Sequence, residues 1–220
     1  MIKLPQQTLA ISLLWLTSTQ FCSAAPVTFT DDSLFFSATS GFSNSILDFE
    51  SQTGGDIINN GDEIGRISFA YDFGGVSMQV GDTELTVSGN NYLGTDDGDI
   101  FLSGDDFNLS FSASHAIGLY FITADTLLDT DLMLSVGATT ANLIAADIVQ
   151  TLSDGSDVYF LGIVDTEESF TAASITAADD TDFLFNVDDI STATAVPAPS
   201  IIYLLGLGLL SLFGMRKNYL

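Results

Sequence analysis

Residues 66–73 read Arg-Ile-Ser-Phe-Ala-Tyr-Asp-Phe, and two glycines follow them. Every second residue from Ile67 to Phe73 is large and apolar, or aromatic. Because successive side chains of a β-strand point to opposite faces, this period of two predicts a strand with one buried face. The glycines end the strand at a turn.

The same pattern recurs through the middle of the chain. Short segments rich in branched and aromatic residues alternate with turn-forming stretches such as 89–91 (Gly-Asn-Asn) and 153–156 (Ser-Asp-Gly-Ser). The further predicted strands are 76–80, 84–87, 107–111, 116–123, 132–136, 142–146, 158–164, 174–176 and 183–190. Without a long amphipathic helix among them, they predict an all-β domain over residues 25–192, an antiparallel β-sandwich of jelly-roll type.

The charge of this middle region is strongly one-sided. The chain of 220 residues has 29 Asp and Glu but only 4 Lys and Arg. Between residues 26 and 195 the only cation is Arg66, and all 29 carboxylates lie in the same region. The formal charge of this region is therefore −28. Such a surface repels phosphate backbones, so we expect no nucleic-acid partner. Hydrophobic residues make up 46% of the chain, enough to build a core and exclude a disordered protein.

The first 24 residues have the layout of a secretory signal peptide. Lys3 precedes an apolar run at 9–16, and small residues surround Ala24, after which we expect cleavage. The alternative is an uncleaved anchor, although the run is short for a membrane span of about 20 residues. Cleavage removes Cys22, the single cysteine, so neither disulfides nor thiolate metal sites are expected in the mature domain.

The other end of the chain, residues 193–220, predicts a single apolar helix followed by a basic end. Residues 201–215 carry no charge, and Arg216 and Lys217 come directly after them. Positive residues next to an apolar run hold that side in the cytoplasm, so this segment is expected to cross the inner membrane. The alternative is a buried C-terminal helix of the globular domain, but the run shows no polar stripe.

A short motif precedes this helix: Val196-Pro197-Ala198-Pro199-Ser200. The order of Pro-x-Pro motif, Leu- and Gly-rich helix and basic end resembles the PEP-CTERM sorting signal of bacterial exosortase substrates, in which Glu usually stands at the place of Ala198. The resemblance implies that exosortase, a membrane-embedded transpeptidase, cleaves near the motif. The helix would tether the exported chain to the inner membrane until then, and the product would pass to the cell envelope or the extracellular polysaccharide matrix.

The strand pattern also resembles the jelly-roll domains that exosortase substrates often carry, which are similar in shape to carbohydrate-binding sandwiches. The matching stretches are 46–50, 116–121, 159–163 and 183–190. This resemblance implies a structural or adhesive role in the matrix, with a glycan-binding module as the alternative.

Clustered carboxylates make calcium the one cofactor that the sequence suggests, because Ca²⁺ prefers hard oxygen ligands held by loops. One candidate site is the loop with Asp96, Asp97 and Asp99. The other joins the first strand of the sandwich to the last, since these commonly lie side by side, and consists of Asp48, Glu50, Asp188 and Asp189. The competing interpretation is that these carboxylates are solvated turn residues that keep the surface soluble.

Catalysis has little support. The only histidine, His115, is in no recognisable nucleophile motif, so we expect no enzyme of the triad type. A glycoside hydrolase that uses two carboxylates remains a third alternative, because the domain has many acids. For the glycan-binding alternative we expect exposed tyrosine platforms, drawn from Tyr71, Tyr92, Tyr120 and Tyr159. We expect Arg66 to pair with a neighbouring carboxylate, Asp62 or Glu63.

Overall fold

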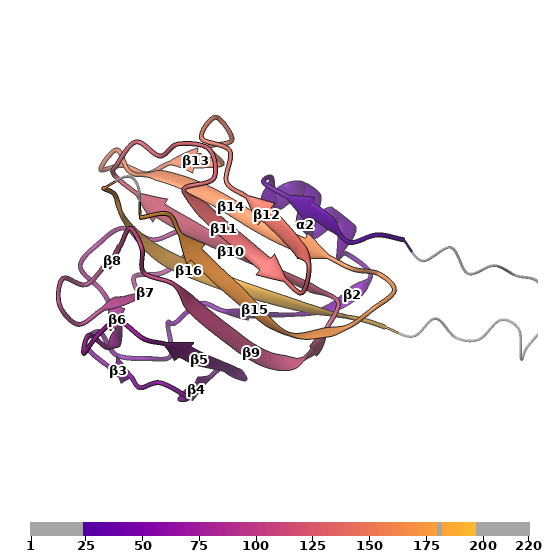
Figure 1. The fold of residues 1–220 in the computed structure, drawn as a ribbon, viewed down its shortest axis with the longest axis horizontal. Helices are drawn as coiled ribbons and strands as arrows, with labels where there is room; N and C mark the ends of the chain where they lie inside the picture. Colours follow the sequence, from indigo (N-terminus) through magenta and orange to yellow (C-terminus); the bar gives the residue numbers. More distant parts are fainter. Residues whose placement is uncertain (1–23, 180–181, 197–220) are drawn as a thin grey trace, which may run out of the picture.

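A computed structural model describes residues 24–179 and 182–196 (Figure 1). The signal peptide, the sorting motif beyond Val196 and the expected apolar helix with Arg216 and Lys217 lie outside these residues. Among the described residues, no helix is long and apolar enough to cross a membrane.

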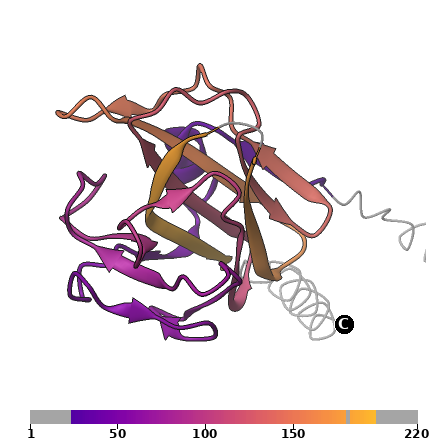
Figure 2. The ribbon, with the colours of Figure 1, turned by 60° about the vertical axis from the view of Figure 1, so that its left-hand side comes forward.

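Two antiparallel sheets make up the described domain, and they face each other across one core (Figures 1 and 2). The large sheet has the order β1-β14-β10-β16-β7-β6-β3; β2 and β8 also pair with β16, and β13 pairs with β14. Its strands are β1 (Val27–Phe29), β2 (Phe42–Leu47), β3 (Ile57–Ile58), β6 (Met78–Gly81), β7 (Tyr92–Thr95), β8 (Phe101–Leu102), β10 (Ala116–Thr123), β13 (Gln150–Thr151), β14 (Asp157–Val164) and β16 (Leu184–Ala195).

The small sheet has the order β12-β11-β15-β9-β5-β4. Its strands are β4 (Glu63–Ile64), β5 (Ile67–Tyr71), β9 (Phe107–Ser114), β11 (Leu132–Val136), β12 (Thr139–Asn142) and β15 (Phe170–Ala177). The long strands alternate between the sheets along the chain, since β9, β11 and β15 belong to the small sheet and β10, β14 and β16 to the large one. The fold is therefore the predicted β-sandwich.

Several predicted segments differ in the structure. Residues 84–87 form a loop, and the segment predicted at 142–146 contributes only Asn142 to a strand. A short helix, α2 (Asp32–Ala38), was not predicted. Asp31 caps the start of this helix. Its carboxylate accepts a hydrogen bond from the Leu34 backbone N–H, a first-turn donor that has no carbonyl partner within the helix.

Alternation along the strands builds the core between the sheets. In β9, Phe107, Leu109 and Phe111 are buried while Asn108 and Ser110 are exposed. The central strands β10 and β14 are buried on both faces, because α2 and nearby loops cover the outer face of the large sheet.

A pair of glycines makes room for this cover. Gly118 of β10 and Gly162 of β14 lie directly opposite each other, and the Phe35 ring of α2 sits above them. Phe35 also contacts the Phe160 ring, with ring centroids 5.1 Å apart. Without side chains at the two glycines, the aromatic ring of α2 can approach the sheet backbone closely.

We expect Gly162→Ala to destabilise the domain by about 1–3 kcal/mol, since the new Cβ would lie 2.6 Å from Phe35 Cδ2 and 2.8 Å from Phe160 Cε1. Urea unfolding measures the difference. Gly41→Ala is the matched control, because an added Cβ there meets no atom within 4 Å. Equal stability of the two variants would contradict the proposed packing of α2.

Candidate functional site

The structure brings together the four carboxylates of one predicted site at a corner of the large sheet. Strand β2 pairs with β16, with Leu47 opposite Ile190, which sets the residues after β2 beside Asp188 and Asp189. The predicted strand lies beside the last one, as expected, but it ends at Leu47, so Asp48 and Glu50 follow it and do not lie in it. A β-bulge shifts the pairing of β16 with β10 here, and Asp189 has a φ of 49°.

These carboxylates hold the loop 87–91 from two sides. Asp188 Oδ2 accepts hydrogen bonds from the backbone N–H groups of Val87 and Ser88, at 3.0 and 3.1 Å. Ser88 Oγ donates to Asp189 Oδ1 at 2.8 Å. On the other side, Glu50 Oε1 accepts from the N–H groups of residues 90 and 91, at 2.8 and 2.7 Å. The corner therefore consists of a loop fastened by acidic side chains.

Gly89 lies at the centre of this loop and cannot be replaced without strain. Its φ is +59°, a conformation that favours glycine. A Cβ at this position would also lie 2.0 Å from the carboxyl carbon of Glu50.

Burial raises the pKa of Asp188 to about 7, and the neighbouring Asp189 carboxylate adds to the effect. Asp188 is fully buried, and its bonds to backbone N–H groups only partly oppose the shift. The pKa of Asp189 is also raised, first by burial and then by the charges of Asp48 and Glu50. The charges of Asp48 and Glu50 thus act on the buried pair of β16, Asp188 and Asp189.

The chemistry of this donor set, oxygen only, suits a hard cation. Within residues 24–179 and 182–196, however, no three His, Cys, Asp or Glu side chains are arranged to hold a metal ion. As placed, Asp188 and Glu50 aim oxygens at the loop backbone.

The second predicted site does not gather its carboxylates around one point. Asp96 Oδ1 accepts from the Ser77 N–H, and Asp97 Oδ1 accepts from Thr95 Oγ1. Asp99 accepts from Gln79 Nε2 at 3.2 Å. The three donors lie just before β6, in β7 and in β6, so each carboxylate is directed to a different partner.

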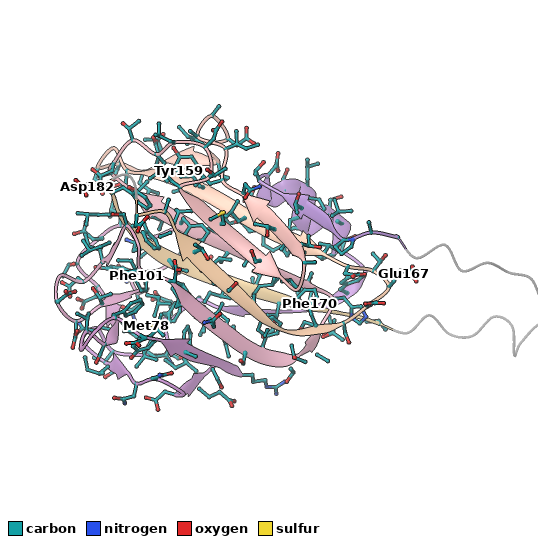
Figure 3. The ribbon with its side chains drawn as sticks, viewed as in Figure 1. Met78, Phe101, Tyr159, Glu167, Phe170 and Asp182 are labelled. Carbon is teal, nitrogen blue, oxygen red and sulfur yellow. The ribbon has the colours of Figure 1, made fainter. Side chains whose placement is uncertain are left out.

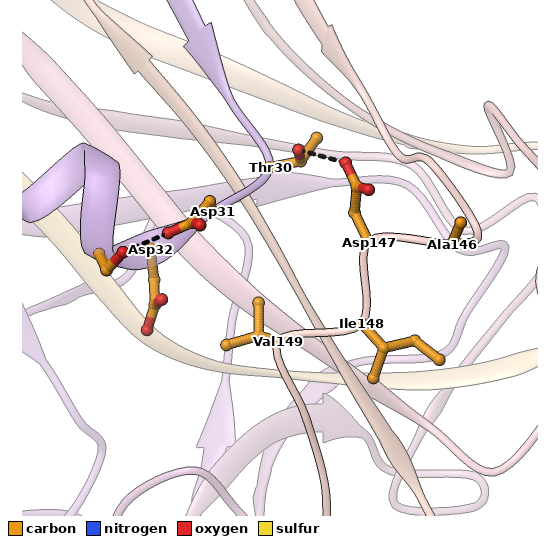
Figure 4. Close-up of a pocket in the computed structure, with 8 residues that line it drawn as sticks. Thr30, Asp31, Asp32, Ala146, Asp147, Ile148 and Val149 are labelled. Atoms are coloured by element: carbon orange, nitrogen blue, oxygen red, sulfur yellow. Dashed lines mark hydrogen bonds between the residues drawn. The ribbon is translucent and has the colours of Figure 1, made fainter.

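A third group of carboxylates, which the sequence did not single out, lines a cavity of about 450 Å³ between the start of α2 and residues 146–149 (Figure 4). Asp31 caps the helix, Asp32 accepts from Tyr120 Oη at 2.7 Å, and Asp147 accepts from Thr30 Oγ1 at 2.6 Å. The only signal in the sequence was the Asp-Asp pair at the helix start. All three carboxylates have protein partners.

The expected tyrosine platforms are wrong. Tyr92, Tyr120 and Tyr159 are buried, and Tyr71 is half-buried with its hydroxyl bonded to the Ile58 carbonyl. Alternation within a strand cannot tell which sheet face will later be covered, and α2 and neighbouring loops cover the outer face of β10.

The two basic side chains of the domain also have defined surroundings. His115 Nδ1 accepts from the Ala195 N–H at 3.2 Å, which gives it a structural role at the C-terminal end of β16. Arg66 is exposed and forms no ion pair with a described carboxylate, so the expected pairing is wrong. Asp62 instead accepts from the backbone N–H and the side-chain amide of Asn59.

We expect the melting temperature of the chain in EGTA to fall as the pH rises from about 5 to 8. The pKa of Asp188 is higher in the folded state, about 7, than the ordinary value of 3.8, so the folded state binds its proton more tightly. The stabilising contribution of this group is therefore full below about pH 4 and is lost as the pH rises through 7.

Thermal melts of Asp188→Asn isolate this contribution from the general repulsion among the other acids. The variant should show a shallower fall of melting temperature over the same range. Asp154→Asn, at an exposed turn carboxylate, is the control and should keep the slope of the unmodified chain. Identical slopes for all three proteins would refute the role assigned to Asp188.

Comparisons with known proteins find no family, and similarity to solved structures is distant. No family model matches the chain, and no curated protein matches it. Among solved structures, the chain is similar to the K2 cleaved adhesin domain of Lys-gingipain (Kgp), with a TM-score of 0.42 and 12% identity. The match covers 68% of this chain and 99% of that domain. At this level the similarity leaves the function to be argued from the residues themselves.

Proposed function

We propose that this chain is an exported β-sandwich protein with a structural or adhesive role, and no catalysis, in a bacterial cell envelope or extracellular polysaccharide matrix. The observation that carries the proposal is the use of the carboxylates. The loop residues Asp105, Asp125 and Asp131 accept hydrogen bonds through their carboxylates from the backbone N–H groups of residues 102, 184 and 128, at 2.7, 2.8 and 2.6 Å. The acids of the corner at Asp188 do the same. Acids used in this way fix loops, as a scaffold protein without disulfides requires.

The proposed route to the matrix rests on the two ends of the chain. The signal-peptide pattern at 1–24 supports export, and the tripartite segment at 193–220 supports a transient inner-membrane tether that exosortase removes. Assignment of the sandwich to the jelly-roll domains of exosortase substrates belongs to the same proposal.

We expect the intact mass of the protein recovered from its native host to lack residues 1–24 and everything beyond the Pro197–Pro199 region. Mass spectrometry of the membrane and extracellular fractions, measured separately, checks both cleavages. If the protein keeps residues 201–220 in both fractions, exosortase processing is refuted. The protein would then be a domain permanently tethered to the membrane.

Calcium is part of the proposal at the corner of Asp48, Glu50, Asp188 and Asp189. A bound Ca²⁺ would supply positive charge to a group of carboxylates that the fold buries or sets close together. The pKa of Asp188 and of Asp189 is raised first by burial and then by neighbouring carboxylates, so a cation bound here would favour the charged form of both groups.

We expect 1 mM Ca²⁺ to raise the melting temperature over that in EGTA. Binding at 100 times the Kd stabilises by about 2.7 kcal/mol, which is roughly 5–10 °C for a domain of this size. Glu50→Gln should remove most of the shift, whereas Asp97→Asn, in the other predicted loop, should keep it. A melting temperature that Ca²⁺ leaves unchanged would eliminate the calcium site.

Glycan binding is the second candidate function. Because the tyrosines are buried, the aromatic platforms expected for it are absent among the described residues, but a pocket with apolar walls and a polar rim at one end of the large sheet favours it on other grounds.

A further inference from the structure

A small pocket lies at the end of the large sheet where β10 ends and β16 begins. Strand β16 starts two residues after Asp182, at the left-hand end of the molecule in Figure 3. The pocket has a volume of about 240 Å³, below the roughly 300–1,000 Å³ of sites for drug-sized ligands, so it suits a group the size of one ring. It is separate from the acidic corner and from the cavity of Figure 4.

Asn186 of β16 is the unusual residue of this pocket. Its neighbours Phe185 and Val187 belong to the core between the sheets, so the Asn186 side chain lies on the outer face, with Ile122 directly opposite it on β10. Asn186 is only 3% exposed, yet its Oδ1 has no hydrogen-bond partner among the described residues. Buried polar groups are nearly always paired, so an unpaired amide oxygen beside a pocket calls for a partner that the protein atoms do not supply.

The surroundings of Asn186 combine apolar walls with a polar rim. Leu85 and Leu184 line the entrance and are 41% and 40% exposed, and Ile122 forms part of the wall. At the rim stand the carboxylates of Glu84 and Asp125, both on exposed residues. Asp125 uses one oxygen, Oδ2, to accept from the Leu184 N–H.

The apolar walls and the polar rim of the pocket match the two kinds of surface on a sugar ring. The C–H groups of the ring can lie against aliphatic side chains, while its hydroxyls donate to carboxylates and both donate to and accept from an amide. The rim carboxylates and the charge of −28 between residues 26 and 195 oppose sugars that carry a carboxylate, sulfate or phosphate.

We propose that this pocket binds one neutral sugar residue at the end of a glycan chain, with Asn186 as the buried group that recognises its hydroxyls. The inference rests on the second candidate function, glycan binding, and supplies its site. It does not depend on exosortase processing or on calcium.

The test begins with the full chain, purified in mild detergent, on an array of neutral, amino-sugar and uronic-acid glycans. Methyl glycosides of glucose, galactose, mannose and N-acetylglucosamine are then titrated, with the side-chain amide signal of Asn186 followed by NMR. We expect neutral glycans to bind, at least one methyl glycoside to shift that signal, and uronic-acid glycans not to bind.

Asn186→Leu is the decisive variant. Leu has the same branched heavy-atom skeleton as Asn, its larger methyl groups can extend into the pocket, and it removes the unpaired oxygen, so the fold should be at least as stable in urea while affinity for the bound glycan falls at least tenfold. Leu85→Ala should weaken binding as well, through the pocket wall. Asn142→Leu makes the same change at an exposed position of β12 and should leave affinity unchanged.

The remaining outcomes overturn either the inference or its basis. Glycan binding that survives in Asn186→Leu would place the ligand elsewhere and refute the pocket while leaving the glycan-binding function intact. Binding of uronic-acid glycans in preference to neutral ones would refute the assigned ligand class. If the unmodified chain binds no glycan, the glycan-binding function itself is refuted, and water is the partner of Asn186 Oδ1.

Discussion

The hydrogen bond from a loop backbone N–H to a carboxylate is the interaction on which the rest of the structure depends. The mature chain is expected to have no cysteine, and Arg66 is its one cation between residues 26 and 195. Neither disulfides nor ion-pair networks can therefore hold the long connections of the sandwich. Aspartates take this role, as Asp131 does for Leu128 and Asp188 does for the loop at Val87. The same side chains keep the surface soluble and restrain the loops, which explains how a domain this acidic stays ordered.

This use of acids also carries an electrostatic cost, because it buries carboxylates close to one another. A carboxylate that fastens a loop must approach the sheet, and at Asp188 this approach means full burial beside a second aspartate. Hydrogen bonds from backbone N–H groups offset part of the desolvation, and the pKa still rises to about 7. A divalent cation at this corner would lower this cost. The proposed calcium binding would therefore be linked to stability and to pH at the same place, where β2 meets β16.

The outer face of the large sheet carries the features that could not be read from strand periodicity. Gly118 and Gly162 look like weak strand positions in the sequence, but together they form the floor on which Phe35 lies. Tyr120 looks like an exposed aromatic, but its hydroxyl donates to Asp32 of α2. Asn186 looks like an ordinary strand residue, and its isolation becomes visible only when β10 and the loop at Leu85 surround it. In each case the deciding neighbour is far away in the chain.

The sequence by itself determined the all-β class, most of the long strands and the strong negative charge, because strand alternation and charge are local properties of residue order. Residues 67–71 form the strand that their alternation predicted, and β2, which leads to Asp48 and Glu50, lies beside the last strand, β16, as expected. Only the tertiary structure decided which acids meet. Three aspartates that are close in the sequence, Asp96, Asp97 and Asp99, accept hydrogen bonds from different parts of the fold. By contrast, Glu50 and Asp189 are 139 positions apart in the chain but lie at the same corner. The physical reason is that hydrogen-bond geometry and burial depend on the pairing of distant strands, which local patterns do not encode.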